Sequence, residues 1–237
     1  MSKIAFLGLG VMGYPMAGHL ATKYDVTVYN RTITKAENWT HQYSGNLATS
    51  PPDAVKGADF VFCCVGNDDD LKSILLGRQG ALDSMAKGSL LVDHTTCSAK
   101  VTKELFSYAE TKGIGYIDAP VSGGQAGAEN GQLTIMCGGI QTDYDKIKPI
   151  IENYAKFSSL MGPPGSGQLT KMVNQICIAG LLQALAEGLS FSQKANLNGK
   201  KVLDVISKGA AGSWQMENRG VTMLEDKFDF GFAVDWM

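Results

Sequence analysis

Short apolar runs alternate with helix-compatible stretches through the first two thirds of the chain, and this alternation restricts the fold more than any other feature. The runs predicted to be strands are Lys3–Leu7, Val26–Tyr29, Phe60–Val65, Leu90–Asp93, Tyr116–Asp118, Leu133–Cys137 and Ser158–Met161. The stretches predicted to be helices between them include Tyr14–Lys23, Leu71–Leu76, Ala99–Thr111 and Tyr144–Asn153. Near-continuous apolar strands joined by helices form a parallel sheet that is covered on both faces. The sequence therefore predicts an α/β fold.

The pattern changes at Gly162-Pro163-Pro164-Gly165-Ser166-Gly167, which continues neither a strand nor a helix. We therefore predict one domain over residues 1–162 and a second over residues 163–237. The glycine spacing resembles that of a phosphate-binding P-loop, but Gln168 stands where that motif requires lysine, so we reject it. From Gln168 to about Lys194 the residues are mostly Leu, Ile, Ala and Met, typical of a helix buried on several sides. Further helices are predicted at Gly199–Ser207 and Trp214–Leu224, which makes the second domain all-helical.

Composition excludes several classes of function. The formal net charge of the 237 residues is -2 and no stripe of Lys and Arg is visible, so a nucleic-acid partner is not expected. The five cysteines form no CxxC pair, which favours free thiols in a reducing, cytoplasmic compartment and no metal site. The start of the chain enters a strand pattern at Ile4 without a basic or long apolar segment, so we expect neither a signal peptide nor a membrane span.

A glycine-rich motif follows the first predicted strand and precedes a predicted helix. It reads Gly8-Leu9-Gly10-Val11-Met12-Gly13. In a dinucleotide-binding unit the first glycine makes a tight turn, the second lets the backbone approach the pyrophosphate, and the third lets helix pack on strand. The alternative is a tight turn that binds no ligand. Because the motif lies between a strand and a helix, we predict a Rossmann-type domain that binds a dinucleotide.

The second predicted strand ends at Asn30-Arg31-Thr32, where a dinucleotide-binding fold usually has an acidic residue. A carboxylate there would hold the ribose 2′-hydroxyl of NAD and repel a 2′-phosphate. Asn30 removes that repulsion, and the guanidinium of Arg31 suits a phosphate. We therefore predict that the cofactor is NADP(H). The alternative is that Arg31 is a solvated surface charge.

A polar cluster lies on the long predicted helix, just after the glycine- and proline-rich stretch. Lys171, Asn174 and Gln175 are spaced so that all three share one helix face. A lysine that is desolvated beside a bound nicotinamide can have its pKa lowered toward neutrality and donate a proton to a carbonyl oxygen. The alternative is a solvent-facing lysine. Ser122, Gly123 and Gly124 follow another strand, and their N–H groups can surround a substrate carboxylate. That stretch could instead be a plain turn or hold a serine nucleophile, but no GxSxG motif surrounds Ser122.

Taken together, three motifs resemble those of the β-hydroxyacid dehydrogenases, the family of 3-hydroxyisobutyrate dehydrogenase and the small semialdehyde reductases. The stretches are GLGVMGYPMAGHL (Gly8–Leu20), DAPVSGGQAGAENGQL (Asp118–Leu133) and GSGQLTKMVNQ (Gly165–Gln175). The resemblance implies that Lys171 is the acid/base, that Ser122–Gly124 binds substrate, and that Val65, Gly66 and Thr96 lie at the cofactor. The Asn-Arg-Thr triplet is similar to that of NADPH-preferring members, the glyoxylate and succinic semialdehyde reductases among them.

Two departures accompany this resemblance. The family often has asparagine four residues after the lysine, where this chain has Gln175 preceded by Asn174, so either amide could orient the substrate oxygen. Family members also continue for tens of residues past Met237, through a lysine-aspartate motif that helps to close the cofactor site. We therefore expect the second domain to be truncated at its C-terminus.

The leading hypothesis is an NADP(H)-dependent oxidoreductase acting on a small carboxylate-bearing β-hydroxyacid or semialdehyde. A 6-phosphogluconate dehydrogenase-like enzyme is an alternative, although that enzyme has histidine three residues after the lysine and a longer chain. A non-catalytic Rossmann interaction module and an imine reductase usually lack the lysine that is present here. The apolar stretch Leu169–Phe191 has more apolar faces than one small domain can cover, so we predict a homodimer or homotetramer.

Overall fold

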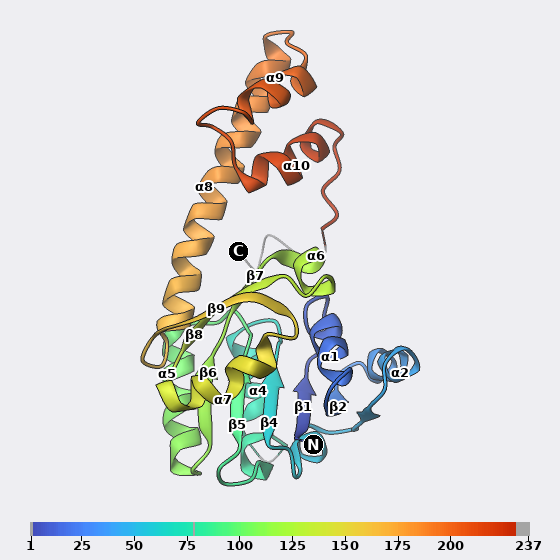
Figure 1. The fold of residues 1–237 in the computed structure, drawn as a ribbon, viewed down its shortest axis with the longest axis vertical. Helices are drawn as coiled ribbons and strands as arrows, with labels where there is room; N and C mark the ends of the chain where they lie inside the picture. The colour runs from blue at the N-terminus through green and yellow to red at the C-terminus, as the bar shows by residue number, and fades with distance from the viewer. Residues whose placement is uncertain (1, 78, 231–237) are drawn as a thin grey trace. The chain divides into compact units, whose positions relative to one another are not determined.

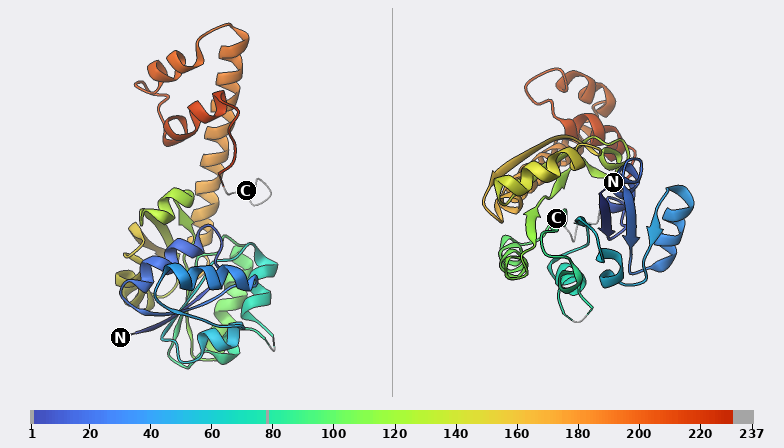
Figure 2. Two further views of the ribbon diagram at one scale, coloured as in Figure 1. Left: turned by 90° about the vertical axis from the view of Figure 1, so that its right-hand side faces the viewer. Right: turned by 60° about the horizontal axis from the view of Figure 1, so that its bottom comes forward.

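The computed structural model describes residues 2–77 and 79–230, and the chain forms two compact units that divide between Lys171 and Met172. Unit 1 contains a sheet with helices on both faces, and unit 2 is helical (Figures 1 and 2). The Rossmann-type sheet domain followed by a helical region is the predicted fold class, which is confirmed. The boundary predicted after residue 162 lies at the end of the last strand of unit 1, before the division after Lys171.

The elements of unit 1 alternate for most of its length. Its strands are β1 (Lys3–Leu7), β2 (Asp25–Tyr29), β3 (Asn46–Leu47), β4 (Phe60–Cys63), β5 (Leu90–Asp93), β6 (Gly115–Asp118), β7 (Val121–Ser122), β8 (Leu133–Gly138) and β9 (Ala155–Gly162). Its helices are α1 (Gly13–Ala21), α2 (Ile33–Gln42), α3 (Pro51–Val55), α4 (Asp68–Leu75), α5 (Ala99–Thr111), α6 (Gly124–Glu129) and α7 (Gln141–Ile151), with a 3-10 turn at Leu82–Ser84.

The sheet has the strand order β3-β2-β1-β4-β5-β6-β8-β7, and β9 pairs with β8. Neighbouring strands from β3 to β6 are all parallel, with Leu7 of β1 opposite both Tyr29 of β2 and Cys63 of β4. The chain therefore leaves β1, β2, β4 and β5 at one edge of the sheet. Loops at the carboxyl ends of parallel strands are where such sheets bind ligands.

The sheet is mixed beyond β6, which differs from the fully parallel sheet expected from the sequence. Strand β8 runs antiparallel to β6 and β7, and β9 runs parallel to β8. The short strand β7 was not predicted, because two residues carry no measurable periodicity. Its place is decided by pairing with β8, where Val121 lies opposite Ile135.

Two hydrophobic clusters form the core of unit 1, one on each face of the sheet. Alternate side chains of β1 enter opposite clusters, Ile4 and Phe6 into one and Ala5 and Leu7 into the other. Side chains of a strand point to its two faces in turn, so a strand that is apolar at every position must be covered on both. The continuous apolar character of Lys3–Leu7 is therefore explained by burial of both faces.

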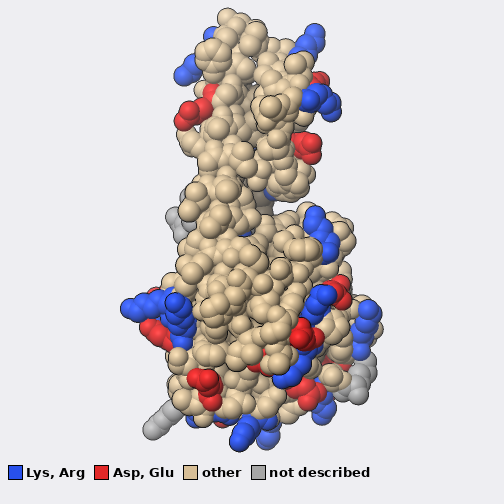
Figure 3. Space-filling model, turned by 60° about the vertical axis from the view of Figure 1, so that its left-hand side comes forward, with Lys and Arg blue, Asp and Glu red and all other residues tan. Residues whose placement is uncertain are grey.

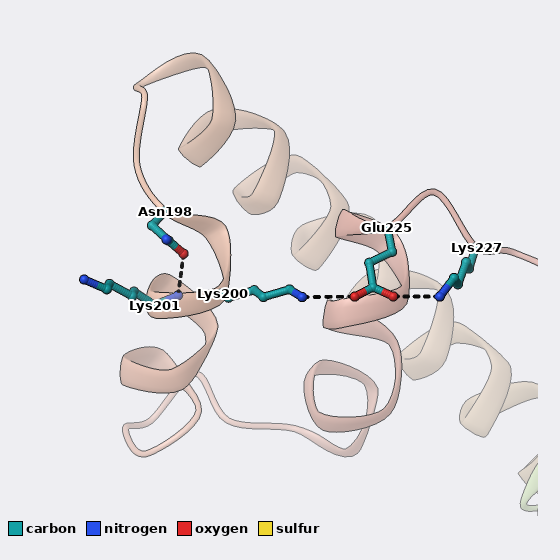
Figure 4. Close-up of polar contacts among 5 residues, drawn as sticks. All are labelled: Asn198, Lys200, Lys201, Glu225 and Lys227. Atoms are coloured by element: carbon teal, nitrogen blue, oxygen red, sulfur yellow. Dashed lines mark hydrogen bonds and ion pairs between the residues drawn. The ribbon is translucent and has the colours of Figure 1, made fainter.

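Unit 2 has a small core of its own. The long helix α8 (Ser166–Lys194) starts in unit 1 and continues into unit 2, where α9 (Gly199–Ile206) and α10 (Trp214–Leu224) follow. Leu185 and Leu189 of α8 pack with Leu203 of α9 and Met216 of α10. Polar contacts supplement this core, because Glu225 accepts ion pairs from Lys200 and Lys227 and Asn198 caps α9 (Figure 4).

Helix α8 is less buried than the sequence predicts. Several apolar side chains on it are exposed, and Ile176 and Phe191 expose 72% and 70% of their surface. The expectation that the helix is buried on several sides is therefore wrong for the single chain. By length and composition this helix is apolar enough to cross a membrane, with 11% of its most apolar window buried, although a core helix of a soluble protein passes the same test.

Charged side chains of both signs occur on one face of the molecule. On the face drawn in Figure 3, Lys and Arg side chains lie among Asp and Glu side chains. Some surface charges of opposite sign form ion pairs, as Lys72 does with Glu104 and Lys112 with Asp83. Such exposed pairs contribute little to stability, because water and salt screen them.

Candidate active site

The glycine-rich loop joins β1 to α1 and has the geometry that a dinucleotide requires. Gly8 has a positive φ of 98°, and a Cβ there would collide with the backbone oxygen of Cys64. A Cβ at Gly13 would collide with the backbone oxygen of Gly8, whereas a Cβ at Gly10 would meet nothing within 4 Å. Gly8 and Gly13 are therefore fixed by the turn and by helix packing, while space is open beside Gly10, where a pyrophosphate would approach. The loop fits a dinucleotide.

Asn30 lies beside this loop and is bonded to it. Its side-chain oxygen accepts the backbone N–H of Leu9 at 2.9 Å, and its side-chain nitrogen donates to the backbone oxygen of Thr32 at 2.9 Å. Thr32 precedes α2 as its N-cap residue. The predicted cofactor triplet is thus brought next to the predicted glycine loop, because β1 and β2 are neighbouring strands.

The guanidinium of Arg31 contacts the carboxylate of Asp70 on α4 at 3.1 Å. The Arg31 side chain is 85% exposed and that of Asp70 is 30% exposed. An exposed guanidinium held by one carboxylate can exchange that partner for a phosphate group. Sequence reasoning did not identify Asp70 as a partner of Arg31, because Arg31 follows β2, Asp70 lies in the first turn of α4, and no motif links the two.

The loops after β4 and β5 complete this edge of the sheet. The backbone N–H of Val65, after β4, donates to Thr95 Oγ1, after β5, at 3.1 Å. Gly66 is exposed and Thr96 is partly buried. The predicted positions Val65, Gly66 and Thr96 therefore lie at the same edge as the glycine loop.

Asp68, Asp69 and Asp70 form the first turn of α4, as expected for carboxylates at a helix N-terminus. Asn67 caps this helix, and the Asp68 carboxylate accepts the backbone N–H and hydroxyl of Ser98 at 2.8 and 2.7 Å. Within residues 2–77 and 79–230, no group of three or more His, Cys, Asp and Glu side chains is arranged to hold a metal ion.

Ser122, Gly123 and Gly124 lie where β7 ends and α6 begins. Gly123 has a φ of 138° and Gly124 a φ of 62°, both in the region that favours glycine. Ser122 pairs with Thr134 of β8, and a Cβ on Gly123 would approach Leu133 Cδ2 to 3.1 Å. The backbone thus turns sharply here, as a turn that directs N–H groups toward an anion requires.

Lys171 lies in the second turn of α8 and is buried, with 7% of its surface exposed. Burial lowers the pKa of its ammonium group to about 8. Asn174 and Gln175 are half-buried, whereas the intervening Met172 and Val173 are exposed. The three predicted residues therefore share the less exposed face of α8, and Asn174 Nδ2 donates to Gln175 Oε1 at 2.9 Å.

The first turn of α8 is held by a residue that sequence reasoning missed as a site residue. The buried Asp118 carboxylate accepts the backbone N–H groups of Gly165 and Gln168 at 2.8 and 2.9 Å. Burial raises the pKa of Asp118, and these hydrogen bonds oppose that rise. Its position at the first letter of the motif DAPVSGG was the available signal.

Comparison with known proteins identifies the family. Residues 3–173 match the model for the NAD-binding domain of 6-phosphogluconate dehydrogenase. Residues 165–237 match the model for the NAD-binding domain of NADP-dependent 3-hydroxyisobutyrate dehydrogenase. The chain belongs to the 3-hydroxyisobutyrate dehydrogenase-like family. The resemblance to β-hydroxyacid dehydrogenases is confirmed, and the family-level function is that of an NAD(P)-dependent hydroxyacid dehydrogenase acting on CH–OH donors.

Individual relatives agree with this family. The chain is 60% identical to an uncharacterized oxidoreductase of Shewanella frigidimarina, over 100% of this chain and 82% of that protein. It is 32% identical to 2-hydroxy-3-oxopropionate reductase of Escherichia coli K12, over 98% of this chain and 79% of that protein. The solved structure of Psf3 in complex with NADP+ and 2-OPP has a TM-score of 0.91 and 25% identity, and the match covers 98% of this chain and 82% of Psf3.

Proposed function

We propose that this protein is an NADP(H)-dependent oxidoreductase that interconverts a small β-hydroxyacid and its semialdehyde, with Lys171 as the general acid/base. The observation that carries the proposal is the buried Lys171, whose pKa is lowered to about 8, on a helix that starts beside the strand ends. An acid/base is most effective when its pKa lies near the working pH.

Three observations favour NADP(H) over NAD(H). An amide rather than a carboxylate stands at Asn30, and the adjacent Arg31 guanidinium is exposed and paired with a carboxylate that a phosphate can replace. A structural relative, Psf3, was solved with NADP+. The glycine loop would lie along the pyrophosphate of the cofactor, Asn30 at its adenosine ribose, and Val65, Gly66 and Thr96 toward its nicotinamide end.

The reaction requires the protein to transfer one proton and to orient the substrate oxygen. When bound, the reduced nicotinamide supplies a hydride to the carbonyl carbon. Negative charge then develops on the carbonyl oxygen, and the Lys171 ammonium donates the proton that converts this oxygen to a hydroxyl. In the reverse direction the neutral Lys171 amine accepts the hydroxyl proton, so one residue serves both directions. Asn174 or Gln175, on the same helix face, orients the substrate oxygen.

The proposed substrate carries a carboxylate. The sharp turn at Ser122–Gly124, with positive φ at Gly123 and Gly124, supports this, because such turns can direct backbone N–H groups toward an anion. The Escherichia coli relative is named for its action on 2-hydroxy-3-oxopropionate, which is a small carboxylate-bearing aldehyde. A 6-phosphogluconate dehydrogenase-like activity is less favoured, because Asn174 stands where that enzyme has histidine.

We further propose a cytoplasmic homodimer or homotetramer without nucleic-acid or membrane partners. The exposed apolar side chains of α8, Ile176 and Phe191 among them, require a cover in water. A second copy of the chain is a common cover for such a surface. Under this proposal the apolar length of α8 serves subunit contact rather than membrane insertion.

The direct test is NADPH oxidation by the protein with glyoxylate and with succinic, tartronate and methylmalonate semialdehydes. We expect turnover with at least one of them and preference for NADPH over NADH. Absence of turnover with all four compounds would contradict the substrate class, and preference for NADH would contradict the cofactor.

A further inference from the structure

The amide of Gln168 connects two parts of the candidate site that lie far apart in the sequence. Its side chain is fully buried, with 0% of its surface exposed. Gln168 Nε2 donates to the backbone oxygen of Thr95 at 2.7 Å, and Gln168 Oε1 accepts the backbone N–H of Cys97 at 3.2 Å. The two hydrogen bonds therefore hold the loop after β5 on both sides of Thr96.

The backbone of Gln168 is fixed as firmly as its side chain. Its N–H donates to the buried Asp118 carboxylate at 2.9 Å. The preceding Gly167 packs directly on the sheet, because a Cβ there would lie 2.8 Å from the backbone oxygen of Asp118 and collide with that of Met136. The first turn of α8 consequently has one position against β6 and β8, and the Gln168 amide transmits that position to the Thr96 loop.

Lys171 lies three residues after Gln168, on the same side of the helix. A movement of the first turn of α8 therefore moves Lys171 as well. Asp118 sets the position of this turn, and Gln168 joins it to the loop that carries Thr96. Within unit 1, the proton donor and the cofactor-side loop share one rigid connection.

We propose that Gln168 is a positioning residue, whose amide sets the place of Lys171 relative to the Thr96 loop and so aligns proton donation with hydride transfer. This inference rests on the proposed function. A misplacement of about 1 Å in a reacting site can lower turnover about 100-fold. Gln168 acts through Thr96 and Lys171 rather than on the reacting atoms.

The test compares Gln168→Met, which keeps the length of the side chain and removes both hydrogen bonds, with Gln193→Met at an exposed position on the same helix. For Gln168→Met we expect kcat to fall about 10- to 100-fold. We expect NADPH affinity to stay within about threefold, because the glycine loop is unchanged. Gln193→Met should match the wild type in both measurements.

The pH profile separates positioning from general support of the fold. If Gln168→Met loosens the first turn of α8, water reaches Lys171. The pKa of Lys171 then rises from about 8 toward its ordinary value. As a result, the alkaline limb of the pH profile of kcat for reduction moves to higher pH. Gln168→Glu is a second variant, should Gln168→Met fold poorly. Its carboxyl can donate to the Thr95 oxygen only when protonated, so its kcat for reduction should keep rising as the pH is lowered below the range in which the wild-type kcat has levelled off.

Hydrogen–deuterium exchange gives a measurement that does not depend on Lys171 chemistry. In Gln168→Met we expect the amides of residues 95–97 and 165–171 to exchange faster together, and in Gln193→Met to keep their wild-type rates. Unchanged exchange, with kcat and the alkaline limb as in the wild type, would overturn the inference. The variant Lys171→Ala, measured in parallel, tests the proposed function separately. If Lys171→Ala remains active, the proposed function fails, but the exchange rates of Gln168→Met still report on the contacts of Gln168.

Discussion

The side-chain oxygen of Asn30 accepts a hydrogen bond from the backbone N–H of Leu9 at 2.9 Å. The residue at the cofactor-selecting position therefore also fixes the glycine-rich loop to the end of β2. A carboxylate could accept the same hydrogen bond, but it could not replace the donation from Asn30 Nδ2 to the backbone oxygen of Thr32, so the loop itself also favours an amide here. The amide is therefore explained by its two loop contacts, and under the proposed function it also leaves room for a 2′-phosphate.

Asn30→Asp should shift the cofactor preference from NADPH toward NADH, with the hydrogen bond from the Leu9 N–H kept and the one to the Thr32 oxygen lost. The carboxylate still accepts the Leu9 N–H, but it repels a 2′-phosphate and can hold a ribose 2′-hydroxyl. We expect NADPH to bind about 10- to 100-fold more weakly, equivalent to about 1.4–2.7 kcal/mol, and NADH to bind at least as well as in the wild type. Fluorescence titration with both cofactors measures this. Unaltered NADPH affinity would show that no phosphate lies near residue 30.

Arg31→Ala tests the phosphate contact itself. We expect a loss of roughly 1.5–3 kcal/mol for NADPH, about ten- to a hundredfold in affinity, and little change for NADH. Asp70→Asn is the matched variant, because it leaves Arg31 in place and removes its competing carboxylate. NADPH should then bind at least as tightly as in the wild type. Equal losses for NADPH and NADH in Arg31→Ala would mean that Arg31 only supports the fold.

Lys171→Ala should abolish most turnover while leaving cofactor binding intact. We expect kcat to fall roughly 10²–10⁴-fold, because the proton donor is lost. NADPH affinity should remain near that of the wild type, since the Gly8–Gly13 loop is untouched. Lys171→Arg should fail almost as badly, because a guanidinium stays protonated and cannot accept the proton in the reverse direction. Retention of more than about a tenth of wild-type kcat by Lys171→Ala would refute this mechanism.

The pH dependence of the two directions should be opposite. Burial lowers the pKa of Lys171 to about 8, so its ammonium form prevails below that pH and its amine form above it. Reduction requires the acid, and its rate should fall as pH rises through about 8; oxidation requires the base and should increase over the same range. Steady-state rates in both directions across this range provide the measurement. Reduction that is independent of pH through this range would exclude Lys171 as the proton donor.

The exposed apolar face of α8 should be buried in an interface with a second copy of the chain. Ile176→Lys places a charge where 72% of the isoleucine surface is exposed, so it costs little in the single chain and disrupts an apolar interface. Light scattering at micromolar concentration should give a dimer or tetramer for the wild type and a smaller species for Ile176→Lys. A wild-type monomer would contradict the proposed assembly. Lys194→Glu, at the end of the same helix, controls for charge alone.

Sequence reasoning predicted the elements whose pattern is local. The strands Lys3–Leu7 and Leu90–Asp93 and the helices Ala99–Thr111 and Trp214–Leu224 occur with the bounds expected from their periodicity. It did not predict α2, whose buried residues, Ala36 and Trp39, are too few to give a strong pattern. The glycine motif was recognisable because tight turns and close backbone approach each require glycine at a fixed spacing.

Tertiary structure decided what each polar side chain contacts. Lys171, Asn174 and Gln175 were predicted to share a helix face from spacing alone, but the burial that lowers the lysine pKa depends on packing around the start of α8. Asp118 reaches Gln168 and Arg31 reaches Asp70 across long stretches of sequence. Periodicity and turn chemistry depend on residues that are close together in the sequence, and the sequence therefore determines the elements and the glycine loop. The partners of buried charges and amides follow from strand order and close packing, which exist only in the folded chain.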